Sequence, residues 1–291
     1  MTRRGVPRQT ARMPAGLPSP LPLLALGLLG SMAVGQRPEP ECHYSATTAG
    51  VVASRTARSG FVARVVATAD TSDPERRCAA EVVGPDGNVV WRGEGFGARL
   101  DPWSGDLDGD GTEDVVLAIE EGGGNRGVWR SVVIGLRWPP PPVIELGFAP
   151  DLVTAANGRT FLVELLAFYG LGPSMAESPV AFRVHRIDRG RLRDVTVAHC
   201  PSLLGSARDT AFARHAAPTL DSTQLARSRT GADVTYEVVQ VRVDAMSRIL
   251  QLGICGDDAG ARALARATWP AAEWADRYRL LSDNARQRQP D

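Results

Sequence analysis

The sequence contains the acidic stretch Asp106-Leu107-Asp108-Gly109-Asp110-Gly111-Thr112-Glu113-Asp114, which runs directly into Val115-Val116-Leu117-Ala118-Ile119. Aspartates occupy positions 1, 3, 5 and 9 of this nine-residue loop. The alternation lets the first three aspartates converge on one point while the residues between them turn outward, and the glycine at position 6 permits a sharp turn. The apolar, β-branched run that follows is typical of a buried strand.

Oxygen ligands at this density favour Ca²⁺, which takes about six to eight of them. Mg²⁺ prefers fewer protein ligands and more water, and no cysteine or histidine lies near enough in the sequence to indicate zinc. The backbone carbonyl of Thr112 at position 7 can add a further oxygen. The alternative is a polar Asp/Gly turn without metal. Against it, four aspartates within nine residues repel one another unless a cation neutralises them.

The loop differs from an EF-hand, which needs a glutamate at position 12, where this chain has Leu117. Asp114 can instead close the site from position 9. Asp-x-Asp-Gly-Asp-Gly-x-x-Asp running straight into a strand resembles the calcium loops of FG-GAP/VCBS-type repeats, found in β-propeller blades such as those of integrin heads. The resemblance covers residues 106 to about 119. It implies side-chain ligands from Asp106, Asp108, Asp110 and Asp114 and a carbonyl ligand from Thr112. Because protein fills all these positions, a structural calcium ion is expected rather than a catalytic one.

The composition gives no electrostatic case for binding nucleic acid. The chain of 291 residues has 33 basic and 33 acidic side chains, and every basic one is arginine, which indicates a high-GC bacterial genome. Four of the arginines belong to residues 1–35, so the remainder has 29 arginines against 33 acids and a net charge of −4. A mildly acidic protein lacks the basic surface that nucleic acid requires.

Residues 1–35 have the pattern of a signal peptide. Four arginines precede a short apolar run at 21–29, and Ala33-Val34-Gly35 places small residues where cleavage before Gln36 is expected. The apolar run is short for a bilayer span, so no stable membrane span is expected after signal removal. A retained N-terminal anchor is the alternative. The signal predicts a periplasmic or secreted bacterial protein.

The four cysteines, Cys42, Cys78, Cys200 and Cys255, fit the oxidising compartment that such a signal implies. None of them forms a Cys-x-x-Cys motif, which disfavours a redox or zinc site. Two disulfides are expected, and of the three possible connectivities we favour Cys42–Cys78 with Cys200–Cys255, one in each half of the chain.

The patterning predicts a mainly β chain with a C-terminal helical segment. Alternating runs surround the acidic loop, and a Pro-Asp-Gly turn at 85–87 indicates a hairpin. Residues 139–200 echo this arrangement with a period of about 46 residues, but the second loop has lost its acidic ligands. We therefore expect an antiparallel region at 36–200 that is blade-like or a sandwich, with one degenerate repeat. Residues 201–291, rich in Ala, Arg and Leu, are expected to be mainly helical.

Local patterns also indicate the bounds of some elements. Residues 78–83 alternate like a strand, Gly93 to Gly97 breaks the strand pattern, and a strand is expected over 192–197 after the turn at 188–190. Asp257 and Asp258 are good N-caps for a helix over 259–268.

Three functional hypotheses follow from the sequence. The favoured one is a non-catalytic exported protein that binds calcium and has a binding or structural role toward an unknown protein or envelope component. The alternative is an exported hydrolase, although the sequence has no Gly-x-Ser-x-Gly elbow and no His-Glu-x-x-His motif. The paired carboxylates of a glycosidase have no characteristic spacing in a sequence, so this kind of hydrolase stays an open alternative. The third is an inhibitor or assembly partner that would use the helical end.

Overall fold

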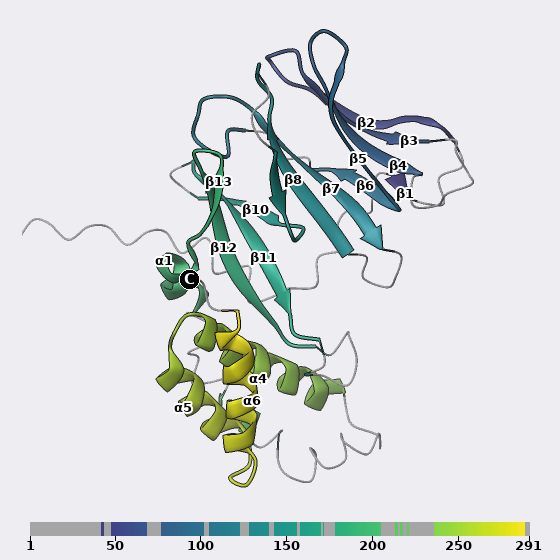
Figure 1. Ribbon diagram of the computed structural model, residues 1–291. Helices are drawn as coiled ribbons and strands as arrows, with labels where there is room; N and C mark the ends of the chain where they lie inside the picture. Colours follow the sequence, from purple (N-terminus) through teal and green to yellow (C-terminus); the bar gives the residue numbers. More distant parts are fainter. Residues whose placement is uncertain are drawn as a thin grey trace, which may run out of the picture.

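The structure of the protein is a computed structural model (Figure 1). It describes residues 42–43, 48–68, 77–101, 105–122, 128–139, 143–155, 158–169, 171, 178–204, 213–214, 216–217, 220 and 236–288. The expected signal peptide at 1–35 lies outside the described residues. No helix in the described part of the chain is long and apolar enough to cross a membrane.

The described strands form three antiparallel sheets. The first has the order β2-β3-β4-β5, with strands Gly50–Thr56, Val62–Ala67, Cys78–Val83 and Val89–Gly95. The second has the order β1-β6-β7-β8-β9, with strands Cys42–His43, Gly97–Leu100, Asp114–Gly122, Val128–Gly135 and Ile144–Leu146. The third has the order β10-β11-β12-β13, with strands Asp151–Thr154, Thr160–Ala167, Val180–Asp188 and Arg191–Asp194.

In the described part of the chain, the helices after the sheets include α1 (Thr196–Leu203), α4 (Tyr236–Ile254), α5 (Asp258–Thr268) and α6 (Trp274–Arg286). α5 begins where the sequence predicts, because the carboxylate of Asp257 accepts a hydrogen bond of 3.0 Å from the Gly260 N–H and so caps the helix. The mainly β chain with antiparallel sheets and a C-terminal helical part is confirmed. The described residues form no closed propeller.

The sheets and helices stack as layers, in the order of the chain (Figure 1). β7 in the middle sheet shows why: its residues alternate between two apolar cores. Val115, Leu117 and Ile119 pack in the core shared with the β2–β5 sheet, whereas Val116 packs in the core shared with the β10–β13 sheet. A third core joins the β10–β13 sheet to the helices. The long apolar run after the acidic loop is therefore a strand buried on both faces.

Two disulfides join neighbouring layers. Cys42 in β1 is bonded to Cys78 in β4, and Cys200 in α1 is bonded to Cys255, which follows α4. These are the pairs that the sequence favoured. The first bond connects the middle sheet to the β2–β5 sheet, and the second holds α1, which follows the third sheet, against the helical layer.

Two details of the predicted elements were wrong. A strand was expected over 192–197, but β13 ends at Asp194 and helix α1 begins at Thr196, whose hydroxyl accepts a hydrogen bond of 2.9 Å from the Val184 N–H. Gly93 to Gly97 was read as a break in the strand pattern, yet β5 continues to Gly95 and β6 starts at Gly97.

Gly95 is required by a close approach between the first two sheets. A Cβ at this position would lie 2.4 Å from the carbonyl oxygen of Glu120 and 2.6 Å from the side chain of Ile119. The nearest atom belongs to backbone and cannot rotate away, so the two sheets would have to separate.

We expect Gly95→Ala to destabilise the protein by about 1–3 kcal/mol, because it overpacks this contact. Gly147→Ala is the matched control: it has nothing within 4 Å of its Cβ position, and we expect a change within about 0.5 kcal/mol. Urea unfolding of the two variants measures the difference. Equal unfolding midpoints would show that the sheets do not meet at Gly95.

Candidate metal centre

The acidic loop connects β6 to β7 in the middle sheet and is anchored at both ends. The Asp114 N–H donates a hydrogen bond of 2.7 Å to the carbonyl of Gly105, which closes the base of the loop. Leu107 is 5% exposed and packs in the core between the middle sheet and the β10–β13 sheet. Gly109 and Gly111 have φ values of +80° and +87°, which only glycine adopts readily. The loop therefore turns sharply while one of its side chains stays in the core.

Backbone N–H groups of the loop hold the carboxylates in place. Asp106 accepts hydrogen bonds from the N–H groups of Gly109 and Gly111, each 2.7 Å long, and one of 3.1 Å from Asp110. Asp108 accepts one of 3.1 Å from the Asp110 N–H. Hydrogen bonds of this kind, from backbone N–H groups to the side chain of a preceding aspartate, fold the loop around its carboxylates.

Three of the predicted ligands come together. Asp106, Asp108 and Asp114 each offer one carboxylate oxygen, and these oxygens all lie within 4.8 Å of one another. Asp106 is exposed and Asp108 is partly exposed, whereas Asp114 is buried at 4% exposure and accepts a hydrogen bond of 2.6 Å from the Leu107 N–H. The cluster thus has an open side and a buried floor.

Asp110 is engaged differently from the other predicted ligands. Its Oδ1 accepts a hydrogen bond of 2.8 Å from the Thr112 N–H and another from the Thr112 hydroxyl, while its Oδ2 lies 2.9 Å from Nη1 of Arg137. The structure therefore does not place Asp110 within the three-carboxylate cluster. The carbonyl ligand from Thr112 stays a prediction. Glu113 points elsewhere, and its Oε2 accepts a hydrogen bond of 2.7 Å from the Arg58 N–H.

A small cavity of about 20 Å³ adjoins the carboxylates of Asp108, Asp110 and Asp114. Its other walls come from β8, β9, β12 and the turn between β12 and β13, through Val133, Gly135, Ile144, Ile187 and Gly190. A space of this size holds one water molecule or one small ion. The site therefore lies where the middle sheet meets the β10–β13 sheet.

The electrostatics of the loop centre on Asp114. Burial, and then the negative charges of Asp108 and Asp106, raise the pKa of Asp114 to about 7, although the hydrogen bond from Leu107 acts to lower it. Burial and the neighbouring charge of Asp110 also raise the pKa of Asp108. Burial acts to raise the pKa of Asp110 as well. The hydrogen bonds from Thr112 and the charge of Arg137 outweigh this effect, so the pKa of Asp110 is lowered.

The donor set fits a hard cation. All three clustered groups are carboxylates, and Ca²⁺ and Mg²⁺ prefer oxygen ligands. A cation held by Asp106, Asp108 and Asp114 would offset the burial and the neighbouring negative charges that raise the pKa of Asp114.

Arg137 is the neighbour of the loop that sequence reasoning missed. The antiparallel register pairs Asp114 with Gly135, so the residues that follow Gly135 lie beside the end of the loop. Pairing the strand at 115–119 with its return strand residue by residue would have placed Arg137 there. The walls from Ile187 and Gly190 belong to another sheet, and no local pattern indicates them.

His185 is the most enclosed of the histidines that the structure describes. It is 6% exposed, its Nε2 lies 2.8 Å from a carboxylate oxygen of Glu164, and its ring stacks on Phe148 with centroids 5.0 Å apart. This burial leaves a substrate no access to a His–Glu pair that could otherwise serve as a base. His199, beside Phe161, has its pKa lowered by burial.

Comparisons of the chain with protein-family models, with curated proteins and with solved structures found no match.

In the absence of metal, Asp114 should make the stability of the protein depend on pH. Its pKa of about 7 in the folded state lies above the ordinary value of about 3.9. The contribution of protonated Asp114 to the stability of the fold is therefore full below about pH 4 and is lost as the pH rises through about 7. In chelator we expect Asp114→Asn, which keeps an acceptor for the Leu107 N–H, to raise the melting temperature by a few degrees at pH 8 and to change it little at pH 5. Thermal unfolding of both proteins across this range tests the sign; an equal slope for both would contradict it.

Proposed function

We propose that the loop 106–114 binds one Ca²⁺ and that the protein is an exported, non-catalytic bacterial envelope protein with a binding or structural role. The observation that carries this proposal is the convergence of Asp106, Asp108 and Asp114 within 4.8 Å. Asp114 is buried, so its negative charge is costly without a counter-ion. An ion at this point would bind the folded chain and not the unfolded one, and would stabilise it by mass action.

We further propose that the three sheets are blade-like repeats of the FG-GAP/VCBS type, in an open arrangement. Each contains four strands that follow one another in the chain, with β1 added to the middle sheet. β7 begins at Asp114 and β11 at Thr160, a spacing of 46 residues that matches the predicted period. Each is the second strand of its repeat. The turn before β11 closes with a hydrogen bond of 2.8 Å from the Ala155 N–H to the Arg159 carbonyl and carries no carboxylate ligands, which supports a degenerate repeat.

The size of the site supports a structural ion rather than a catalytic one. The cavity beside the carboxylates, about 20 Å³, has room for an ion and no room for a substrate. The three clustered carboxylates all belong to the loop before β7, so a bound ion would fix this loop, whose Leu107 packs in the core shared with the β10–β13 sheet. The two disulfides are compatible with a periplasmic or secreted location.

Calcium should raise the melting temperature of the mature chain, from Gln36, by roughly 5–10 °C over chelator when it is present at about 100 times its dissociation constant. We expect Asp108→Asn to abolish this rise because it removes one carboxylate of the cluster. Asp110→Asn should reduce it less, because Asp110 is already paired with Arg137. Differential scanning calorimetry with calcium, magnesium and chelator makes the comparison.

The control is Asp276→Asn, which removes a carboxylate from the exposed Asp276–Arg279 pair on α6 and should leave the calcium shift unchanged. If calcium does not change the melting temperature of the wild-type protein, the metal site is refuted. A shift that persists in Asp108→Asn would place the ion elsewhere.

A further inference from the structure

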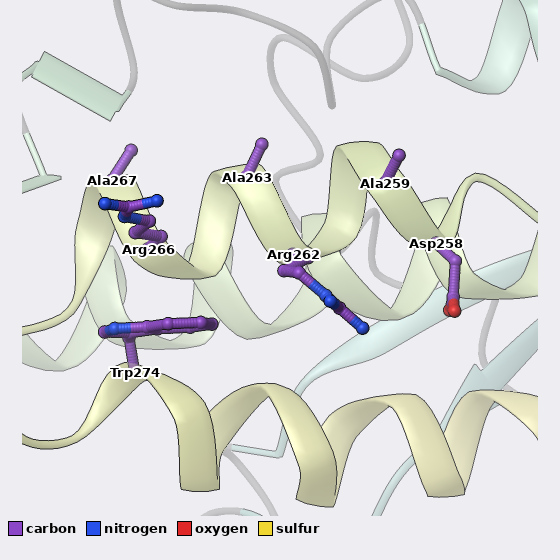
Figure 2. A pocket seen from close by; sticks show the side chains of 7 residues that line it. All are labelled: Asp258, Ala259, Arg262, Ala263, Arg266, Ala267 and Trp274. Atoms are coloured by element: carbon purple, nitrogen blue, oxygen red, sulfur yellow. The ribbon is translucent and has the colours of Figure 1, made fainter.

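A groove lies on the helical layer between α5 and α6, far in the sequence from the acidic loop (Figure 2). It consists of a hollow of about 790 Å³ and a second one of about 220 Å³, which share Arg262 and Trp274 in their walls. We call this surface the α5–α6 groove. Its walls combine an apolar strip with positive charge.

The apolar strip is a row of three alanines. Ala259, Ala263 and Ala267 are exposed, recur every fourth residue and point the same way from α5 (Figure 2). Side chains at this spacing form one ridge of a helix surface. Because these side chains are so short, another helix can approach the backbone of α5 closely along the row.

A second row on α5 carries positive charge beside the alanines. Arg262 and Arg266 are exposed and one turn apart; Arg262 extends toward α6, whereas the guanidinium of Arg266 stays beside α5 (Figure 2). Arg262 lies over the ring of Tyr278, 5.1 Å from its centroid. Within the described part of the chain neither guanidinium forms an ion pair, although other arginines nearby do: Arg279 pairs with Asp276, and Arg286 with Asp258 and Asp283.

The floor of the groove contains an unsatisfied polar group. Tyr278 is 8% exposed and lines the smaller hollow, and its buried hydroxyl has no hydrogen-bond partner among the described residues. Folded proteins rarely leave such a group unpaired. Trp274, half-buried at the groove wall, offers an aromatic face of the kind that is enriched at protein interfaces.

We propose that the α5–α6 groove is a docking surface for an acidic amphipathic helix of a partner protein. Carboxylates one turn apart on that helix would pair with Arg262 and Arg266, and its small or apolar face would pack on the alanine row and Trp274. Guanidinium groups suit this role because they bind carboxylates in a fixed, two-pronged geometry.

Two other occupants fit the surface less well. In a two-fold dimer with α5 antiparallel to its copy across Ala263, Arg262 would face Arg262 of the copy, and the like charges would repel. A membrane surface prefers uniformly basic faces, whereas Asp258 and Asp283 are exposed on this one. Both carboxylates pair with Arg286, whereas Arg262 and Arg266 form no ion pair within the described residues. These two arginines therefore favour an acidic protein segment.

The test uses the mature full-length chain and a labelled synthetic helix of about 20 residues, with Glu pairs at i and i+4 beside a face of Ala and Leu. Fluorescence anisotropy should show saturable binding with a micromolar Kd that weakens with salt. The same peptide with Lys in place of Glu should not bind. Arg266→Gln and Arg262→Gln should each weaken binding about tenfold or more, and Ala263→Gln should weaken it by obstructing the alanine row.

The matched control is Arg191→Gln, which removes one exposed arginine from β13, outside the groove, and should leave the Kd unchanged. Circular dichroism confirms that each variant is folded. The proposal fails if the acidic peptide shows no saturable binding, or if Arg191→Gln weakens binding as much as Arg266→Gln. It is also overturned if peptide binding is absent while sedimentation equilibrium shows Ala263-dependent dimers, or phosphatidylglycerol vesicles bind through Arg266.

Discussion

The structure depends on a carboxylate that is buried at the start of its central strand. Asp114 begins β7, which is covered on both faces by apolar cores, and its side chain is 4% exposed. Burying this charge is unfavourable, as its raised pKa of about 7 shows. The fold can compensate in two ways, by a proton on Asp114 or by a cation among the neighbouring carboxylates. The proposed calcium ion corresponds to the second, and the N–H groups of the loop hold Asp106 and Asp108 toward the same point, as such an ion requires.

Local patterns in the sequence predicted those elements whose residues decide their own structure. Strand β4 at 78–83, the hairpin turn after it and the Asp257 cap of α5 all depend on neighbours in the chain. Helix α1 was missed because Thr196-Val197 favours a strand by propensity, whereas the Thr196 hydroxyl is bound to the backbone of Val184 across the fold. In the same way Gly95 looked like a strand breaker because the backbone it contacts is 25 residues away, at Glu120.

In the candidate site too, the features set by neighbouring residues were predicted from the sequence, and those set by distant contacts were not. The alternation of aspartates predicted the cluster of Asp106, Asp108 and Asp114, since these positions and the glycines between them set the loop geometry. Asp110 as a ligand stays a prediction; its carboxylate is paired with Arg137, which follows β8. The walls from Ile187 and Gly190 arise only when the third sheet packs on the second, and this packing has no signature in the loop.

The two disulfides leave the boundary between the second and third sheets without a covalent link, and the proposed ion would lie at this boundary. Cys42–Cys78 ties the first two sheets together, and Cys200–Cys255 ties the exit of the third sheet to the helices. All four cysteines of the chain are used in these bonds, so no disulfide crosses the boundary between the second and third sheets. That boundary is where the acidic loop lies, with Leu107 in its apolar core and Ile187 and Gly190 against its carboxylates. A cation held by Asp106, Asp108 and Asp114 would fix the shape of this loop and, with it, the place of Leu107 in the core that the two sheets share. The proposed calcium ion would therefore act, through the loop, on a boundary that no disulfide crosses.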